Sequence, residues 1–526
     1  MWNSFLMNKN GAVVLAALLC FAAAFPLRAQ VSLSETSSGR NVFPLSAKTC
    51  AAIMYDAVSE PSVVGTAVGL LASDIEKVTG RVPSVSGNGS VPESCRYAVI
   101  AGTLGHSSLI DALVRERKID VSSISGDWER YAVRLVEAPL KGVRRALVVV
   151  GSDRRGTAYG LLSLSRAIGV SPWYWWMDAP VEHRNSIYLS VNAYDAATPS
   201  VKYRGIFIND EDWGLLRWAK RNFEKELGNI GPKTYEKVCE LLLRLNANML
   251  APAMHEASTA FYQIPRNKEV ADRYGIIITA SHCEPLLLNT ASEWQKDRYG
   301  DWNYNTNSER IDSVLNARVV ETSPYENAYV IALRGLHDRA MSGGESLDSR
   351  KATVQRALLN QRKILSDVLG KDASEIPQFF TPYKEVLDVY NQGLELPDDV
   401  TIVWPDDNYG YMKRLSGPKE QLRSGRSGVY YHSSYLGRPH DYLWMNTTSP
   451  TLMYEELRKA YDSTADRYWL LNSGDIKSCE FAVDFFLSMA YDIDSFSYER
   501  AASYRSEWLC GMLGGKNRDT YRSIFD

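Results

Sequence analysis

Two patterns of hydrophobic and polar positions divide the chain near residue 200. From Val31 to Ala196, short apolar runs typical of strands, such as YAVIAGT and RALVVVGSD, alternate with amphipathic runs typical of helices, such as TAVGLLASDIEKVTG. This alternation predicts strands that pair in a sheet, with helices packed on its faces. We therefore expect a small α/β domain over residues 30–196.

Beyond Ser200 the chain contains eight apolar runs, and each of them ends in polar residues. The runs are YRGIFINDED, ANMLAPAMHE, YGIIITASHCE, AYVIALRGLHD, QFFTPYKE, VTIVWPDDN, GVYYHSSY and RYWLLNSGD. Amphipathic helix candidates lie between them, among them Tyr235 to Leu245, Ser349 to Leu369, Leu452 to Tyr461 and Phe481 to Tyr491. Eight strand and helix units over about 300 residues predict a (β/α)8 barrel across residues 197–495.

The two ends of the chain have their own patterns. Residues 1–29 combine a polar start, the apolar run AVVLAALLCFAAAF and a small residue, Ala29, before Gln30. The apolar run is shorter than the roughly 20 residues that a membrane span needs, so we predict a cleaved signal peptide and an exported protein, periplasmic or extracellular, without a membrane span. Residues 496–526 are helix-like, and we interpret them as the start of a truncated helical domain.

The composition narrows the classes of function. The formal net charge is −3, so there is no overall positive field to hold a nucleic-acid backbone, and we do not expect nucleic acid as a partner. Six cysteines remain after the predicted cleavage, too few for a disulfide scaffold in so long a chain. Cys50 and Cys95 are a candidate disulfide pair. Neither a CxxC nor an HExxH motif occurs, and we expect no metal and no other cofactor.

The polar ends of the eight runs are the candidate chemistry, because the carboxyl ends of barrel strands share one mouth where active sites lie. They are Asn209, Asp210, Glu211, His255, Glu256, His282, Glu284, Arg334, His337, Asp338, Tyr383, Lys384, Glu385, Asp406, Asp407, Asn408, Tyr430, Tyr431, His432, Tyr435, Asn472 and Asp475. Such a set fits glycoside hydrolysis, which uses one protonated and one ionised carboxyl group. Crowded carboxylates raise the pKa of at least one member. The cations could neutralise a carboxylate pair or recognise an anionic substrate.

Several stretches together resemble glycoside hydrolase family 115, the xylan α-1,2-glucuronidases, over essentially all of the mature length. They are SPWYWW (171–176), FINDED (207–212), TASHCEP (279–285), LRGLHDRAM (333–341), YKEV (383–386), LPDDVTIVWPDDNYG (396–410), GVYYHSSYLGRP (428–439) and LNSGDIK (471–477). The resemblance implies an inverting, exo-acting enzyme that releases glucuronic acid or 4-O-methylglucuronic acid from xylan or a related plant polysaccharide. It also allows a homodimer of the full-length protein.

The resemblance implies roles for individual residues. Glu385 in YKEV and Asp338 in RGLHD are expected to form the acid and base pair, and which of them donates the proton is open. Contacts to the sugar or its carboxylate are expected from Asp210, His282, Arg334, Tyr383, Asp406, Asn408 and Tyr430, with His432 beside them at the end of the seventh run. Members of the family often carry a further acidic residue in the loop that here contains His337, so the resemblance does not extend to local pKa tuning or substrate choice.

Two other functions fit the same residues. A barrel with His282, Asp338 and His432 as ligands could be a metal-dependent hydrolase, although no tight spacing motif supports it. A protein with this pocket could also capture acidic oligosaccharides without cleaving them. The aromatic segment SPWYWW has two interpretations as well, and we favour packing between domains over the stacking of sugars.

Overall fold

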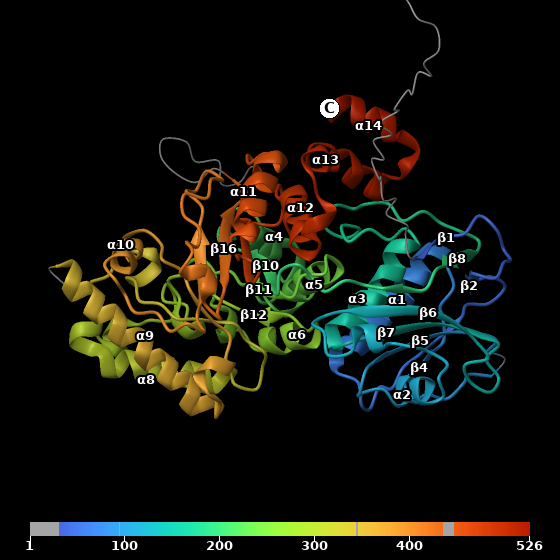
Figure 1. The fold of residues 1–526 in the computed structure, drawn as a ribbon, viewed down its shortest axis with the longest axis horizontal. Helices are drawn as coiled ribbons and strands as arrows, with labels where there is room; N and C mark the ends of the chain where they lie inside the picture. The colour runs from blue at the N-terminus through green and yellow to red at the C-terminus, as the bar shows by residue number, and fades with distance from the viewer. Residues whose placement is uncertain (1–30, 94, 343–345, 435–445, 526) are drawn as a thin grey trace, which may run out of the picture.

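The computed structural model describes residues 31–93, 95–342, 346–434 and 446–525. Two lobes lie side by side, the N-terminal part of the chain in one and the barrel in the other (Figure 1). The predicted signal peptide, residues 1–29, and the strand-end residue Tyr435 lie outside the described residues. No helix within those ranges is long and apolar enough to cross a bilayer.

The N-terminal lobe is an α/β unit with two sheets, as expected. The larger sheet has the order β4-β3-β5-β7-β6-β9, with strands Val85–Ser86, Ala52–Met54, Tyr97–Thr103, Arg145–Gly151, Tyr131–Glu137 and Tyr194–Asp195. The smaller sheet has the order β1-β8-β2, with strands Val31–Leu33, Ile187–Val191 and Val42–Ser46. Helices α1 (Ser62–Thr79), α2 (Ser108–Arg115) and α3 (Arg154–Ala167) pack against these strands.

Alternation along β7 shows why the larger sheet is covered on both faces. Leu147 and Val149 belong to the apolar cluster that contains α1 and α3, whereas Val148 and Val150 belong to the cluster that contains α2. Successive strand side chains point to opposite faces. An apolar run without polar interruption therefore requires cover on both sides, and the three helices provide it.

The second lobe is a ring of eight parallel strands; seven lie within predicted runs, and β16 begins one residue before its run. They are β10 (Tyr203–Phe207), β11 (Met249–Ala251), β12 (Ile277–Ile278), β13 (Tyr329–Val330), β14 (Gln378–Phe380), β15 (Thr401–Pro405), β16 (Ser427–His432) and β17 (Tyr468–Asn472). The sheet order is β12-β11-β10-β17-β16-β15-β14-β13. Ile278 bridges to Asn327, and Ala328 N–H donates to the Ile278 carbonyl oxygen at 3.0 Å, so the ring closes between β12 and β13. This confirms the predicted barrel.

Side chains fill the interior of the barrel. Tyr203, Phe207, Met249, Phe379 and Tyr468 belong to one buried cluster, to which all eight strands or their flanking residues contribute. Gly205 on β10 makes room for this packing, because a Cβ there would overlap the Met249 carbonyl oxygen. Since the centre of the ring is packed, substrate has access only to its ends.

Helices surround the ring. They are α4 (Leu215–Trp218), α5 (Pro232–Arg244), α6 (Asn267–Arg273), α7 (Lys296–Tyr299), α8 (Tyr304–Thr322), α9 (Leu347–Leu369), α10 (Glu385–Asn391), α11 (Pro450–Asp462) and α12 (Glu480–Tyr491). The four named helix predictions correspond to α5, α9, α11 and α12. After β15 the connection to β16 contains only a short 3-10 turn, Glu420–Leu422, so the sixth unit departs from the regular pattern. Helices α13 (Tyr498–Leu513) and α14 (Arg518–Phe525) follow the barrel.

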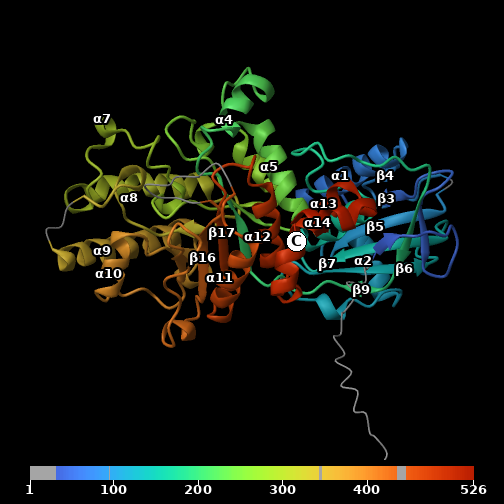
Figure 2. The same cartoon turned by 90° about the horizontal axis from the view of Figure 1, so that it is seen from above.

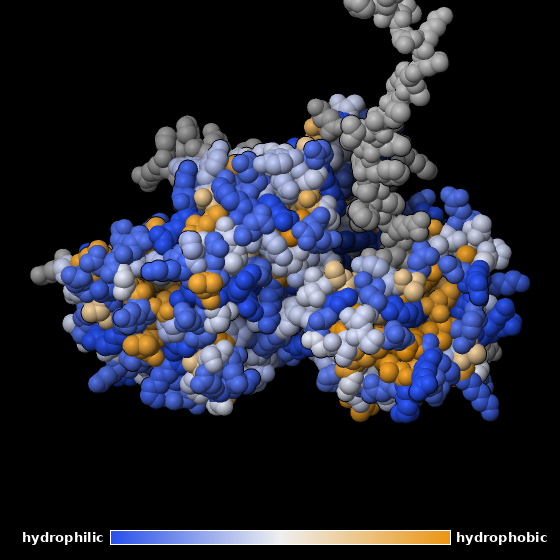
Figure 3. Space-filling view, viewed as in Figure 1, coloured by the Kyte–Doolittle hydropathy of each residue, from blue (hydrophilic) through white to orange (hydrophobic). Residues whose placement is uncertain are grey.

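The outer surface matches the amphipathic pattern of these helices. In the view of Figure 3 the barrel lobe is largely hydrophilic, and more apolar residues appear on the N-terminal lobe. Exposed apolar side chains of that lobe include Val58, Val82 and Val85. The polar faces of α8 and α9 meet water, as the helical period of their sequences predicts.

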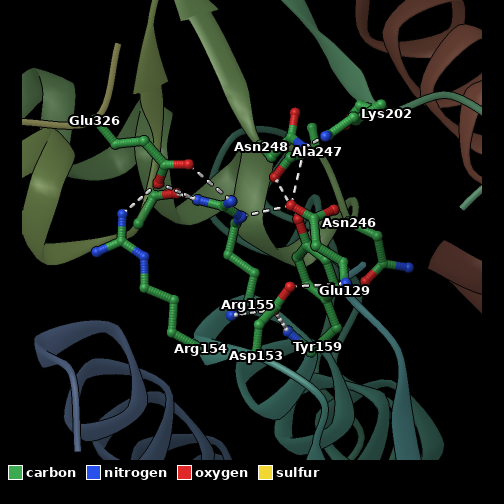
Figure 4. Close-up of polar contacts among 12 residues, drawn as sticks. Glu129, Asp153, Arg154, Arg155, Tyr159, Lys202, Asn246, Ala247, Asn248 and Glu326 are labelled. Carbon is green, nitrogen blue, oxygen red and sulfur yellow. Dashed lines mark hydrogen bonds and ion pairs between the residues drawn. The ribbon is translucent and has the colours of Figure 1, made fainter. Parts of the chain in front are cut away.

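A buried ionic network joins the lobes at the amino-terminal end of the barrel strands (Figure 4). Glu129, fully buried, accepts hydrogen bonds from Arg155, from Arg204 Nη2 at 2.5 Å and from Asn248 Nδ2 at 2.9 Å. Arg155 also contacts Glu326 at 2.6 Å. Three elements far apart in the chain therefore meet on one carboxylate, at the end of the barrel opposite the predicted site.

The cysteines do not form the suggested disulfide. All six described cysteines are free. Cys50 Sγ lies 3.8 Å from the Arg81 carbonyl oxygen, whereas Cys95 Sγ lies 3.2 Å from that of Tyr97. The pairing of Cys50 with Cys95 was therefore wrong, because the two thiols face different parts of the N-terminal lobe.

Candidate active site

One arginine links the two carboxylates predicted to be catalytic. Arg334, which follows β13 and is 2% exposed, forms an ion pair with Asp338. The same guanidinium donates from Nη2 to Glu385 Oε2 at 2.8 Å and from Nε to Glu385 Oε1 at 3.1 Å. The residues come from the ends of β13 and β14. The parallel register of these neighbouring strands thus brings them to one edge of the ring.

Asp338 has two further partners. His282 Nε2 lies 2.6 Å from Oδ1, and Lys384 Nζ lies 2.9 Å from Oδ2. Burial, together with the nearby charges of Arg334 and Lys384, holds the pKa of His282 well below its ordinary value. The Nε2 atom faces a carboxylate oxygen, so His282 donates its Nε2–H when Asp338 is ionised. Three donors favour the ionised form of Asp338.

The backbone is strained around this group. His337, Asp338, Lys384 and Asn408 have φ angles of 50°, 60°, 49° and 66°. Non-glycine residues in this region cost about 1–3 kcal/mol each and cluster at functional sites. Four such residues at the ends of three different strands therefore indicate that the mouth is shaped for function. His, Asp and Asn adopt positive φ more often than other non-glycine residues, so Lys384 is the least expected of the four.

Aromatic rings extend the site from β14 to β16. The ring centroids of His282 and Tyr383 are 4.3 Å apart, and those of Tyr430 and His432 are 4.9 Å apart. His282 also lies 5.6 Å from Tyr430. The Tyr383 hydroxyl donates to Asn408 Oδ1 at 3.3 Å, which brings another predicted binding residue into contact with this wall.

A second buried pair lies next to the aromatic rings. His432 Nδ1 lies 2.5 Å from Asp406 Oδ1, and the Gly410 N–H donates to Asp406 Oδ2 at 3.1 Å. His432 Nε2 and His282 Nδ1 are buried and have no hydrogen-bond partner in the described part of the chain. Buried polar atoms normally have partners, so these two nitrogens are available to a ligand.

Asp210, after β10, is an acidic residue of the mouth with a raised proton affinity. Burial, followed by the charges of Asp212 and Glu211, raises the pKa of Asp210 to about 7, although His432 opposes the shift. His255 Nε2 lies 3.9 Å from its Oδ1 atom. Near neutral pH a large share of Asp210 thus carries a proton and can donate a hydrogen bond.

The structure therefore gathers all ten predicted site residues at the carboxyl end of the barrel, and other strand-end residues have structural roles. Asp407 accepts the N–H groups of Tyr409 and Tyr411, so it closes a turn. Sequence reasoning missed the Met341 N–H, which donates to Glu385 Oε1 at 3.3 Å. A backbone donor of this kind leaves no residue signature in a sequence.

Glu284 lies beneath the mouth and gives the fold a pH dependence. Burial raises its pKa to about 8, from an ordinary value near 4.5. Between these pH values the unfolded chain loses the proton while the folded chain keeps it. The free energy of unfolding therefore falls as the pH rises from 4.5 to 8.

Glu284→Gln is expected to remove this part of the pH dependence, because glutamine does not ionise. At pH 8 the variant should be more stable than the wild type by on the order of a few kcal/mol. Urea unfolding at pH 5 and pH 8 measures the difference, and Glu375→Gln at an exposed position is the control. Equal pH slopes for Glu284→Gln and the wild type would contradict this assignment.

A metal centre is the rival chemistry for these residues. Among the described residues, His282, Cys283 and Asp338 bring ligand atoms within 4.8 Å of one another, and His432 is not part of this group. Arg334 Nη1, however, lies 3.4 Å from His282 Nε2 and also pairs with Asp338. Burial raises the pKa of Cys283 to about 12, so its thiol keeps the proton that a metal ligand must lose. The positive guanidinium and the neutral thiol make the group a poor cation site.

We accordingly expect exhaustive chelation to leave turnover unchanged within about twofold. The Arg334 guanidinium, and not a metal ion, neutralises the carboxylates. Dialysis of the full-length protein against EDTA, with and without later addition of Zn²⁺ or Mg²⁺, measures this. Loss of turnover that a metal restores would reinstate the metal-dependent mechanism.

The fold and the mouth can now be compared with known proteins. A family model described as "Glycosyl hydrolase family 115" matches residues 196–526, which include the whole barrel. The chain belongs to glycosyl hydrolase family 115. No curated protein matches the chain.

One solved structure agrees with membership of family 115. A structure titled "A novel family GH115 4-O-Methyl-alpha-glucuronidase, BtGH115A, with specificity for decorated arabinogalactans" is 39% identical, with a TM-score of 0.84, and covers 92% of this chain and 62% of that chain. The present family 115 chain thus spans less than two thirds of that relative's length.

Two more distant structures share the fold alone. "Structure of CpGH84D" has a TM-score of 0.51 and 11% identity, over 92% of this chain and 71% of that chain. A "GH138 enzyme targeting pectin rhamnogalacturonan II" has a TM-score of 0.54 and 12% identity, over 90% of this chain and 54% of that chain. At such identities they show a common fold alone.

Proposed function

We propose that this family 115 protein is an exported glycoside hydrolase that removes glucuronic acid, or its 4-O-methyl ether, from the side chains of a plant polysaccharide. The observation that carries the proposal is the joint contact of Arg334 with Asp338 and Glu385. Two carboxylates beside a strong cation provide both an acid and base pair and a means to bind an anionic sugar.

Lys384 is the cation best placed to receive the uronate carboxylate. Its side chain is half exposed, and its ammonium group has three donors, of which Asp338 takes one at 2.9 Å. Arg334 lies deeper in the mouth and holds both carboxylates. A uronate that approaches Lys384 and Arg334 would form charge-assisted hydrogen bonds, which are about twice as strong as neutral ones.

The same contacts suggest which of the two carboxylates acts as the acid and which as the base. Asp338, which three donors surround, acts as the base that activates water. Burial raises the pKa of Glu385, but the hydrogen bonds and charge of Arg334 outweigh burial and lower it below the ordinary value. A bound uronate draws on the same guanidinium and adds negative charge, so it raises the pKa of Glu385 and prepares it as the acid.

Asp210 is the second candidate for the proton donor, because it already holds a proton near pH 7. Substrates with different leaving groups distinguish Asp210 from Glu385 as the proton donor. An aryl glucuronide with an acidic phenol needs little protonation, so it should restore turnover in the variant that lacks the true acid. Restoration in Glu385→Gln assigns the role to Glu385, whereas restoration in Asp210→Asn alone assigns it to Asp210.

Chromatography of released sugars tests the proposed function. The full-length protein is incubated with glucuronoxylan and, separately, with a glucuronidated arabinogalactan. Free uronic acid from either polymer supports the proposal and identifies the substrate class. Tight binding to both polymers without any released uronic acid would overturn it in favour of a binding protein.

A further inference from the structure

The structure contains a cleft of about 470 Å³. The described residues that contact Asp338 and Glu385 do not line it. Trp175 and Trp176, from the end of the N-terminal lobe, line one part of it. Trp218, on the projecting helix α4, lines another, and Asp475 and Lys477 after β17 complete it. Figure 2 shows α4 protruding from the barrel beyond α5.

The tryptophans form a connected platform. The ring of Trp175 lies edge-on to Trp176 at 5.0 Å and to Trp218 at 5.7 Å. Trp218 stacks on Phe223 with centroids 4.9 Å apart and an interplanar angle of 22°. Trp175 and Trp218 are only partly buried, although both pack against the core. Their remaining apolar surface therefore faces the cleft.

Simple packing between the lobes does not account for this space. Protein interiors are close-packed and contain few voids larger than a water molecule. If these residues served only to pack the two lobes together, the tryptophan side chains would fill the space between them. The volume lies instead in the range of about 300–1,000 Å³ that small-molecule sites occupy. The segment SPWYWW therefore packs between the lobes and also lines the cleft.

The cleft borders the loops after β10 and β17, which carry part of the barrel mouth. Asp475 accepts the Leu215 N–H at 2.7 Å and so ties the loop after β10 to the loop after β17. Within the same loops, the Asp210 N–H donates to the Gly474 carbonyl oxygen at 2.7 Å. The loop that carries Asp475, at the border of the cleft, is therefore bonded to the loop that carries Asp210.

We infer that the cleft binds neutral sugar units of the polysaccharide backbone that carries the uronate. This inference rests on the proposed function and extends it to a second binding site. Sugar rings present C–H faces that stack on indole and hydroxyl edges that hydrogen-bond. The tryptophan platform and the polar rim of Asp178 and Lys477 provide both. A uronate in the mouth and a backbone on the tryptophans would then be held together.

Binding of neutral oligosaccharides tests the cleft without catalysis. Xylo-oligosaccharides and β-galacto-oligosaccharides without uronate are titrated into the full-length protein by calorimetry, and the two sugars distinguish the possible backbones. Binding of either is expected, with a loss of about tenfold or more in Trp175→Ala and Trp218→Ala. Trp175→Phe should retain most of the affinity, and the exposed aromatic Tyr411→Ala is the control. No binding of either sugar by the wild type would overturn the inference.

Kinetics separate a binding role from a structural one. In Trp175→Ala, kcat/KM should fall about tenfold further for the polymer than for an aryl glucuronide without backbone, mainly through KM. Equal losses on both substrates would show that the tryptophans only support the fold. Failure of the proposed function looks different, because no substrate would then release uronic acid while the neutral sugars would still bind.

Discussion

Glu385→Gln is expected to lower kcat by about 10²–10⁴-fold, the usual contribution of a positioned acid or base. Glutamine keeps an oxygen for the Arg334 and Met341 donors, so the fold and the site geometry should persist. Steady-state kinetics of the full-length protein on a glucuronidated polysaccharide measure the effect. Circular dichroism and urea unfolding check that the variant is folded.

A matched control sharpens this prediction. Glu375→Gln makes the same chemical change at an exposed position and should turn over normally. Asp338→Ala should lose activity to a similar extent, and azide should restore part of it, because a small anion can replace the missing base. Near-normal turnover of Glu385→Gln would remove Glu385 from the chemistry.

Glu129→Ala is expected to destabilise the protein by about 3–5 kcal/mol, since removing one partner leaves buried charges uncompensated. Both Arg155 and Arg204 lose their shared carboxylate at a site that water does not reach. The contrast is Glu137→Ala, which removes a 60% exposed partner of Arg145 and should cost less than about 1 kcal/mol.

Urea unfolding of the two alanine variants measures this difference. The Glu129 network lies at the opposite end of the barrel from Arg334, so the folded fraction of Glu129→Ala should keep its kcat. Equal stability of the two variants would show that the network does not hold the lobes together. A loss of kcat in fully folded Glu129→Ala would show instead that the network positions the site.

The sequence predicted the barrel well because its signals are local. A strand such as VTIVW, Val400 to Trp404, is an apolar run with a polar end, and period and composition reveal it without any distant contact. The same holds for α9, where a long amphipathic stretch defines the helix. The positions of the site residues followed from one rule, that the carboxyl ends of barrel strands share a mouth.

The partners of those residues could not be predicted, because they depend on contacts between distant segments. Nothing local shows that Arg334 joins Asp338 to Glu385, or that His282 donates to Asp338. Closure of the ring through Asn327 and the short turn after β15 are likewise consequences of packing. The segment SPWYWW illustrates the same limit, because only the structure reveals the cleft beside it.

The stereochemistry of the first product tests the two-carboxylate single displacement most directly. ¹H NMR follows the anomeric signals during the first minutes after the full-length protein is mixed with an α-glucuronide substrate. Attack by water activated at Asp338, with protonation from Glu385, predicts the β-anomer of the free uronic acid first. Initial release of the α-anomer would contradict it, because retention requires a covalent glycosyl intermediate on one of these carboxylates.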